Sequence, residues 1–299
     1  MKTYLDCIPC FFRQALDAAR MAGADETVQK KVLDELARLV PGLALEASPP
    51  EIGREIYALV AKISGEKDPF LKVKKKSNEL ALGFYPKLKK RVKGSSDPLL
   101  TAVELAIAGN IIDYGVKNSL DIEKETAKIF SEDEEIEKAE SKSVFDYLSF
   151  GKAAKSNPSI LYLADNAGEV VFDRVLIEEL FRMGKKITYV VKESPVINDA
   201  LREDAVGCGI DKVATIISSG SDAPGTVLKY CSPEFIQIFN QAKMIISKGQ
   251  GNFEALSEEK NPIFFLFRAK CPVVARDIGG RLGDVILKCN LGGKRKKRK

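Results

Sequence analysis

Apolar side chains recur every three or four residues in several stretches of the first hundred positions. This spacing places them on one face of a helix, as is typical of amphipathic helices that pack on a core. Asp25 stands where an N-cap is expected before the second stretch, and Pro41 follows its end. The lysine-rich residues 67–93 fit the solvated faces of further helices or a connecting loop. The pattern predicts helices over 5–19, 28–39, 52–63 and 98–117.

The pattern changes after Pro158. Short apolar runs rich in β-branched residues now alternate with helical stretches. Strands with helices between them are typical of βαβ units, whose right-handed crossovers put helices on both faces of a parallel sheet. We therefore predict an α/β fold class with a mainly parallel sheet. Its strands are predicted at 160–164, 187–191, 213–217, 244–247 and 263–267.

Oxygen-bearing side chains follow the first two predicted strands. In open parallel sheets, ligands bind outside the carboxyl ends of the strands. Asp165 and Asn166 follow the first strand and Asp199 follows the second, so together they offer only oxygen ligands. Such donors suit Mg²⁺, Mn²⁺, Co²⁺ or Ni²⁺ better than metals that prefer thiolates. The alternative is that Asp165 and Asn166 only cap the next helix.

Groups suited to an anion follow the third and fourth strands. Lys248 and Gly249 come at the end of the fourth strand, and Ser219 lies in a loop of serines and glycine after the third. Such loops let backbone N–H groups approach an anion, and a lysine adds a positive charge. Together with a metal, these groups indicate metal-assisted phosphoryl chemistry. Neither GxxxxGK[ST] nor GxGxxG is complete, which disfavours a nucleoside triphosphatase or a dinucleotide enzyme.

The composition narrows the possible chemistry. The 299 residues include no histidine, which excludes Ser-His-Asp, Cys-His and histidine-ligated metal sites within one chain. The net charge is +5, but the six residues from Lys294 to Lys299 are all basic, so the remainder is near neutral. This argues against a nucleic-acid-binding face and predicts a flexible basic tail at 291–299. No apolar run is long enough for a membrane span and the start does not resemble a signal peptide, so we expect a cytoplasmic protein.

The cysteines leave two interpretations open. Six cysteines in a chain without a secretion signal are expected to be reduced thiols. Cys7 and Cys10 have the spacing of a redox pair or of half a zinc site. The other cysteines form no second close pair, although Cys271, near a strand end, is a candidate to approach the first. The alternative is that the pair is buried and structural.

Taken together, the motifs resemble those of a known family. LADNAGEVVFD after a strand, a later Asn-Asp pair, SKGQGNFE, AGNIID on an earlier helix and an N-terminal CxxC occur in the order typical of the family first catalogued as domain of unknown function eighty-nine. Its members are metal-dependent damage-control phosphatases, and Cys-Ile-Pro-Cys is typical of the archaeal and bacterial branch. The resemblance implies a helical domain packed on a Rossmann-like α/β domain. We place these at 1–95 and 96–290, the second with leading helices over 96–157.

The resemblance also implies residue roles. Asp165, Asn166 and Asp199 match the family's metal ligands. Lys248 matches the lysine that holds the substrate phosphate. The implied activity is hydrolysis of small phosphorylated metabolites such as sugar phosphates, activated by Mn²⁺, Co²⁺, Ni²⁺ or Mg²⁺.

Three further side chains are candidates for the site. Asn110 and Asp113 lie three apart on one face of the predicted 98–117 helix, and we interpret them as groups that reach the metal or the substrate. The alternative is a surface face or an interdomain hydrogen bond. Glu169, on the helix after the metal loop, is a candidate to position water, or it only suits the helix dipole.

Two other functions remain as alternatives. A methyltransferase built on a Rossmann-like sheet would need no divalent ion. A thiol-based redox or metal sensor would depend on Cys7 and Cys10 rather than on Asp165. The sequence carries no signal for an oligomeric state.

Overall fold

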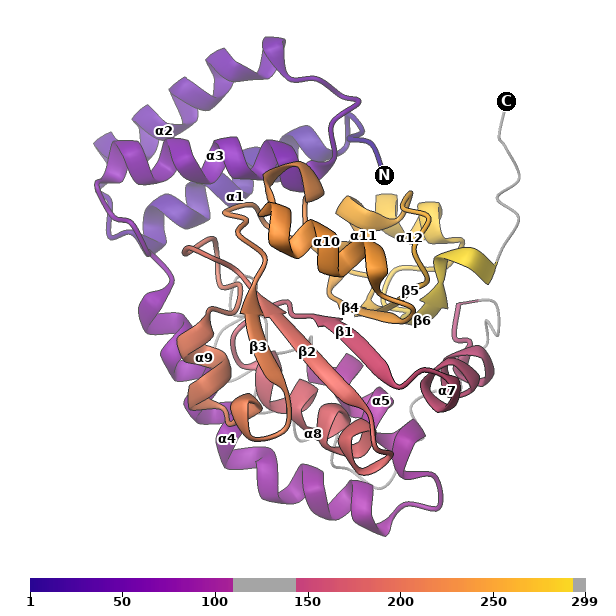
Figure 1. Ribbon diagram of the computed structural model, residues 1–299. Coiled ribbons are helices and arrows are strands. Elements are labelled where there is room, and N and C mark those ends of the chain that lie inside the picture. The colour runs from indigo at the N-terminus through magenta and orange to yellow at the C-terminus, as the bar shows by residue number, and fades with distance from the viewer. Residues whose placement is uncertain (110–143, 293–299) are drawn as a thin grey trace.

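A six-stranded sheet forms the centre of the protein, with helices on both of its faces and a group of three helices at one end (Figure 1). The computed structural model describes residues 1–109 and 144–292. The strand order is β3-β2-β1-β4-β5-β6. The first five strands are parallel, and β6 is antiparallel to β5. The strands are β1 (Ser159–Leu163), β2 (Lys186–Val191), β3 (Thr215–Ser218), β4 (Ile245–Lys248), β5 (Ile263–Arg268) and β6 (Val285–Cys289).

The strand order reverses direction between β1 and β4. Leu161 of β1 lies beside Thr188 of β2 on one side and beside Ile245 of β4 on the other. The chain thus runs outward from β1 to β3 and returns to the opposite side of β1. In doubly wound sheets this reversal opens a crevice at the carboxyl ends of the two central strands, where ligands bind.

Both faces of the sheet are buried. Ile160 and Tyr162 of β1 point into the cluster formed with the helices α4, α5 and α8, whereas Leu161 and Leu163 point into the cluster formed with α10, α11 and α12. This alternation follows from the two-residue period of a strand. It also explains the nearly continuous apolar runs of the sequence. The helices of these layers are α4 (Leu71–Gly94), α5 (Pro98–Ala108), α8 (Glu169–Arg182), α10 (Pro233–Gln241), α11 (Gln250–Leu256) and α12 (Pro272–Ile278), and the connecting helices are α7 (Tyr147–Ser156) and α9 (Arg202–Gly207).

Three N-terminal helices form a core of their own. They are α1 (Cys7–Met21), α2 (Glu26–Leu39) and α3 (Pro49–Ser64). Asp25 accepts a hydrogen bond from the N–H of Val28 and so caps α2, as the sequence predicts. The buried residues of α4 instead join the cluster on the face of the sheet that α8 covers. The boundary placed at residue 95 stays a prediction.

The described helices and strands agree with most of the expected elements. The five predicted strands are confirmed within two residues at each end. The strand β6 was not predicted, because Lys288 interrupts its apolar run. The predicted helix over 98–117 begins at Pro98 and is described as far as Ala108, so Asn110 and Asp113 lie outside the described residues, as does the tail from 293 onward.

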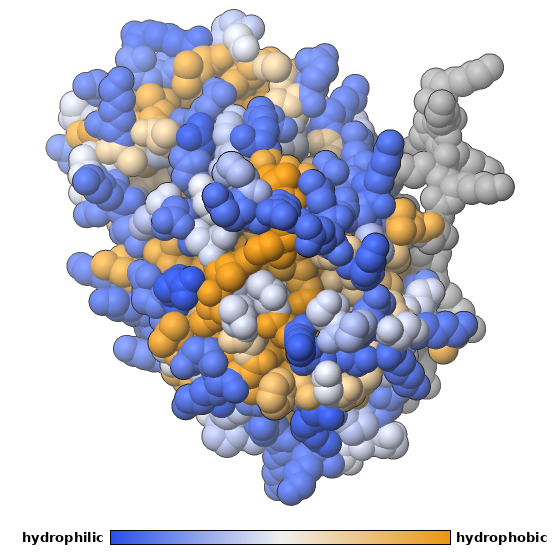
Figure 2. Space-filling model, viewed as in Figure 1, coloured by the Kyte–Doolittle hydropathy of each residue, from blue (hydrophilic) through white to orange (hydrophobic). Residues whose placement is uncertain are grey.

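The surface seen from the same side is hydrophilic at its margins and has an apolar stretch across its middle (Figure 2). None of the described helices is both long enough and apolar enough to cross a membrane.

Candidate active site

The loops after β1 and β2 are joined to each other. Asn166 and Asp199 form an isolated antiparallel bridge. Next to it, the N–H of Ala200 donates to the carbonyl oxygen of Asp165 at 2.8 Å. The three metal ligands expected from the sequence therefore come together, and all three are buried. Their assignment as ligands stays a prediction.

The carboxylate of Asp165 lies against Gly249, at the end of β4. Gly249 has φ +81° and ψ 159°, a region that is essentially reserved for glycine. A Cβ at this position would stand 1.9 Å from Oδ2 of Asp165. Asn252 holds the two strand ends together, because its Nδ2 donates to the carbonyl oxygens of Ala164 at 3.0 Å and Lys248 at 2.7 Å. Asp165 is thus at the reversal point between β1 and β4.

The Asn166 side chain is oriented by two carboxylates. Its Nδ2 donates to Oδ2 of Asp165 and to Oε1 of Glu169, both at 3.1 Å. The helix α8 starts after Gly168 and has no side-chain cap. The N-cap residue of α8 is thus Gly168, and neither Asp165 nor Asn166 occupies that position. With both N–H groups of the amide engaged, its oxygen is turned away from Asp165 and Glu169.

Lys248 lies inside the protein. Its side chain has an exposed fraction of 0%, and its Nζ is 2.7 Å from Oδ1 of Asp173 and 3.2 Å from Oε2 of Glu169. Burial alone would lower the pKa of Lys248, but the charges of Asp173 and Glu169 outweigh it, so the pKa lies above its usual value. Lys248 is therefore an ammonium group held by two carboxylates. Glu254, six residues further along the chain, accepts a hydrogen bond from Gln250 rather than from Lys248.

Two tyrosines complete the surroundings of Asp173. Tyr162 donates to Oδ1 at 2.8 Å and Tyr189 donates to Oδ2 at 2.9 Å. Burial, followed by the charge of Asp173, raises the pKa of both tyrosines far above their usual value, so both remain neutral donors. Both oxygens of Asp173 are thereby engaged.

Lys192 is a site residue that sequence reasoning did not select. It directly follows β2, is buried, and lies 3.5 Å from Oδ2 of Asp199. Its Nζ also donates to the carbonyl oxygen of Gly225. The sequence feature that could have identified Lys192 is its position as a charged residue immediately after an apolar strand.

The donor set fits a divalent cation. Asp165 and Asp199 supply carboxylate oxygens and Asn166 an amide oxygen, the hard ligands that Mg²⁺ and Mn²⁺ prefer. No group of three or more His, Cys, Asp or Glu side chains placed to hold a metal is found among the described residues, and this set has only two such members.

The buried charges at this edge are four carboxylates and two ammonium groups, a formal excess of two negative charges. A divalent cation would neutralise this excess, which is otherwise costly to bury. The six residues are Asp165, Glu169, Asp173, Lys192, Asp199 and Lys248.

The helix α4 and a strained residue support the loops that carry Asp165, Asn166 and Asp199. Asn78 of α4 accepts a hydrogen bond from the N–H of Gly168 at 2.7 Å and donates to Asp204 at 2.7 Å. Ile197 has φ +47°, and a β-branched residue with positive φ is a genuine outlier. Its side chain packs on the core of α1–α3. Because Ile197 lies two residues before Asp199, the helical group and this loop are directly linked.

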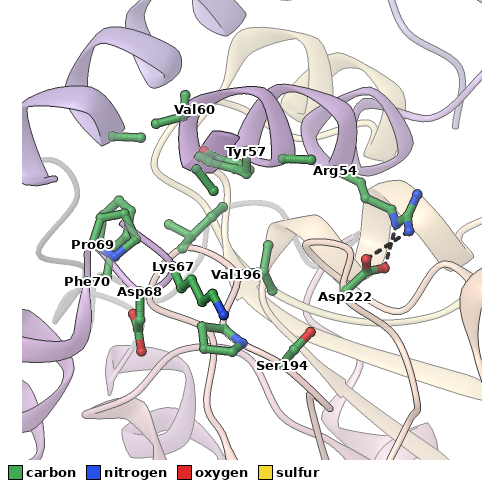
Figure 3. A pocket seen from close by; sticks show the side chains of 15 residues that line it. Arg54, Tyr57, Val60, Lys67, Asp68, Pro69, Phe70, Ser194, Val196 and Asp222 are labelled. Atoms are coloured by element: carbon green, nitrogen blue, oxygen red, sulfur yellow. Dashed lines mark hydrogen bonds and ion pairs between the residues drawn. The ribbon is translucent and has the colours of Figure 1, made fainter. Parts of the chain in front are cut away.

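A cavity of about 150 Å³ adjoins the loop that carries Asp199. It lies between α3, the connection from α3 to α4, and residues 194–197 (Figure 3). Lys67 points into it from the connection, and Arg54 forms an ion pair with Asp222 at its edge, with 2.5 Å between Nε and Oδ1. Two residues span about 7 Å at most, so the backbone of Asp199 is within that distance of Ile197 in the cavity wall.

The backbone donors expected for substrate binding have partners within the protein. The N–H of Gly249 donates to the carbonyl oxygen of Leu266 at 3.1 Å, and the N–H of Ser219 donates to that of Val191 at 2.9 Å. Ser219 is buried in its loop. A substrate-binding role for Ser219 and Gly249 therefore stays a prediction that these two N–H groups do not support.

All six cysteines are free thiols. Cys7 is the first residue of α1, and the Sγ of Cys10 accepts a hydrogen bond from Gln14 at 3.3 Å. Burial raises the pKa of the Cys7 thiol, and the charge of Glu254 raises it further. An approach of Cys271 to the pair stays a prediction. A redox or metal role for Cys7 and Cys10 stays a prediction.

Comparison with known proteins decides the family. The family model described as "Damage-control phosphatase ARMT1-like domain" matches residues 3–286. The chain belongs to this family. The expectation drawn from the motifs is thereby confirmed, whereas its placement in a CxxC-bearing branch stays a prediction.

Related proteins of this family match the chain over nearly its whole length. The damage-control phosphatase PH1575 of Pyrococcus horikoshii is 38% identical over 282 residues, 93% of this chain and 94% of that protein. A damage-control phosphatase of Archaeoglobus fulgidus is 35% identical, covering 94% of this chain and 97% of that protein. The crystal structure of a DUF89 family protein (PH1575) from Pyrococcus horikoshii has a TM-score of 0.83 at 35% identity, covering 97% of this chain and 99% of that one. The mainly parallel α/β fold is therefore confirmed.

Proposed function

We propose that this protein is a divalent-metal-dependent phosphatase of small phosphorylated metabolites. The observation that carries the proposal is the buried set of Asp165, Asn166 and Asp199 at the reversal point of the sheet, within a site whose formal charge is −2. The damage-control phosphatases among the relatives support the reaction class. Metabolite damage control is the corresponding cellular role.

The chain's own residues would hold the ion and the substrate. Asp165 and Asp199 would bind Mn²⁺, Co²⁺, Ni²⁺ or Mg²⁺ through their carboxylates, and Asn166 through its amide oxygen. A bound divalent ion supplies Lewis-acid polarisation of a phosphoryl oxygen. Lys192 partly balances the charge of Asp199 and keeps its carboxylate in place. The substrate part that carries no phosphate would lie in the cavity beside Lys67 and Arg54, because this cavity adjoins the loop of Asp199.

A panel of phosphorylated metabolites assayed with each of the four ions tests the proposal. The protein should hydrolyse at least one of them with an ion present and lose this activity when the ion is chelated. Asp165→Asn removes one ligand charge without a change of size and should abolish both Mn²⁺ binding and hydrolysis. Asp211→Asn, at an exposed position, is the matched control and should behave like the parent.

An unchanged rate in Asp165→Asn would refute the metal assignment. Activity that survives chelation would favour metal-free chemistry of the methyltransferase kind. A function lost on substitution of Cys7 and Cys10, but retained in Asp165→Asn, would favour the thiol sensor.

A further inference from the structure

The carboxylate of Glu169 connects the Asn166 amide to the Lys248 ammonium group. Its Oε1 accepts from Asn166 and its Oε2 accepts from Lys248, and neither Glu169 nor Lys248 has any exposed side-chain area. Asp173 and its two tyrosines hold Lys248 from the other side. A continuous chain of hydrogen bonds therefore runs from the interior of the sheet to a predicted metal ligand.

The consequence for Asn166 follows from the chemistry of the groups. A primary amide has a donor end and an acceptor end of nearly equal size, so it can bind in two orientations. Lysine only donates and an ionised carboxylate only accepts. Lys248 therefore requires an acceptor at Oε2 of Glu169, and the ionised Glu169 presents another acceptor at Oε1. This arrangement admits the Asn166 amide only with its nitrogen toward Glu169 and its oxygen turned away.

We infer that Glu169, held by Lys248 and Asp173, is a positioning residue that keeps the oxygen of Asn166 directed at the metal. The inference rests on the proposed metal site. It assigns Lys248 a role that acts through Glu169 rather than on the substrate phosphate. Neither residue needs to touch the substrate, which agrees with their complete burial.

Glu169→Gln is the decisive substitution, because it changes hydrogen-bonding direction but not size. Lys248 would require the oxygen of the new side chain, which leaves its NH₂ group facing the NH₂ group of Asn166. Asn166 then loses its hydrogen bond to residue 169 and is held by Asp165 alone, so its oxygen is no longer fixed toward the metal. Changes to groups that orient metal ligands typically weaken metal affinity by about 10–100-fold, and we expect a loss of this size for Mn²⁺ in calorimetry without substrate.

Asp173→Asn is the matched charge control. Like Glu169→Gln, it removes one negative charge from the chain of hydrogen bonds. The oxygen of the new asparagine can still accept from Lys248, and its NH₂ group can donate to Tyr189. Its Mn²⁺ affinity should fall by no more than about threefold. Equal losses in Glu169→Gln and Asp173→Asn would show that charge rather than orientation matters, and would overturn the inference.

The double variant Glu169→Gln/Lys248→Gln provides a rescue. The amide at 248 can donate to Asp173 and accept from the amide at 169, whose oxygen then faces Asn166 again. This variant has the formal charge of the parent, and its Mn²⁺ affinity should return to within about threefold of the parent value. A loss of about tenfold or more in the double variant would overturn the inference, even if the single variant does not fold.

The unfolding of each variant in EDTA shows whether the fold is retained. If the parent protein itself binds no divalent ion, the proposed function fails. If the parent binds Mn²⁺ and Glu169→Gln binds it equally well, only the positioning role fails.

Discussion

The Cα of Gly249 lies so close to Asp165 that the protein has no room for a side chain between them. A Cβ at residue 249 would stand 1.9 Å from Oδ2, 2.1 Å from Cγ and 2.5 Å from Oδ1 of Asp165. The glycine therefore does more than permit an unusual backbone conformation. It leaves the space that the carboxylate occupies.

Gly249→Ala should consequently displace Asp165 and weaken Mn²⁺ binding by about tenfold or more, with a parallel loss of phosphatase activity. The unusual backbone conformation adds a destabilisation of about 1–3 kcal/mol in the free energy of unfolding. Gly251→Ala is the matched control, because a Cβ there would be 3.6 Å from its nearest neighbour, an ordinary contact. Calorimetry that finds parent-like Mn²⁺ affinity in Gly249→Ala would contradict the placement of Asp165.

Lys67→Ala should raise KM for phosphorylated metabolites by about threefold to tenfold and leave kcat nearly unchanged. Lys67 points into the cavity beside the Asp199 loop, where its charge would attract an anionic or hydroxylated part of the substrate. Lys62→Ala, an exposed lysine of α3 outside the cavity wall, is the control. Steady-state kinetics with an equal KM in both variants would exclude the cavity as part of the substrate site.

Glu254 should make the protein less stable as the pH rises through the neutral range. Burial raises the pKa of Glu254 to about 7, although a hydrogen bond from Gln250 opposes this. Between the unfolded pKa of 4.5 and this value, the unfolded state has lost the proton that the folded state still holds, so the free energy of unfolding falls with increasing pH.

Glu254→Gln removes this dependence. Relative to the parent, the variant should gain about 1–3 kcal/mol between pH 5 and pH 8, as measured by urea unfolding in EDTA. Glu258→Gln, at an exposed position of the same segment, should show no such gain. A constant difference between parent and Glu254→Gln over this range would refute the raised pKa.

Replacing Cys7 and Cys10 together by alanine should leave phosphatase activity and Mn²⁺ affinity within about twofold of the parent. Cys7 contributes to the core of α1–α3, so some stability should be lost, on the order of 1 kcal/mol. The activity assay and thermal unfolding separate the two effects. Loss of hydrolysis in a folded double variant would give the thiols a direct role.

The proximity of the loops after β1 and β2 was predictable from the sequence for a simple reason. The carboxyl ends of parallel strands meet at one edge of a sheet, so residues directly after β1 and β2 must be neighbours there. The prediction that Asp165, Asn166 and Asp199 lie close together needed no further information. The strand β6 lacked such a signal. It pairs only with β5, and its apolar run contains a charged residue, so its sequence resembles that of an extended loop.

The interior of the site was not predictable in the same way. A lysine at a strand end is ordinarily exposed, and nothing local indicates that Lys248 is buried. Its partner Asp173 lies far away in the sequence and faces it only because α8 packs on β1 and β4. Glu169 and Asp173 are one helical turn apart, which indicates a shared face but not that this face turns inward.

The pairing of β1 with β4 also has a consequence for how the protein refolds. Leu161 meets Ile245 only after α8, β2, β3 and α10, which lie between them in the chain, have been accommodated. Contacts between residues so distant in sequence form slowly, because the intervening chain must first be closed into a loop. The capacity to bind Mn²⁺ should therefore return later than helical circular dichroism after dilution from urea, since Gly249 reaches Asp165 only once β4 has paired with β1.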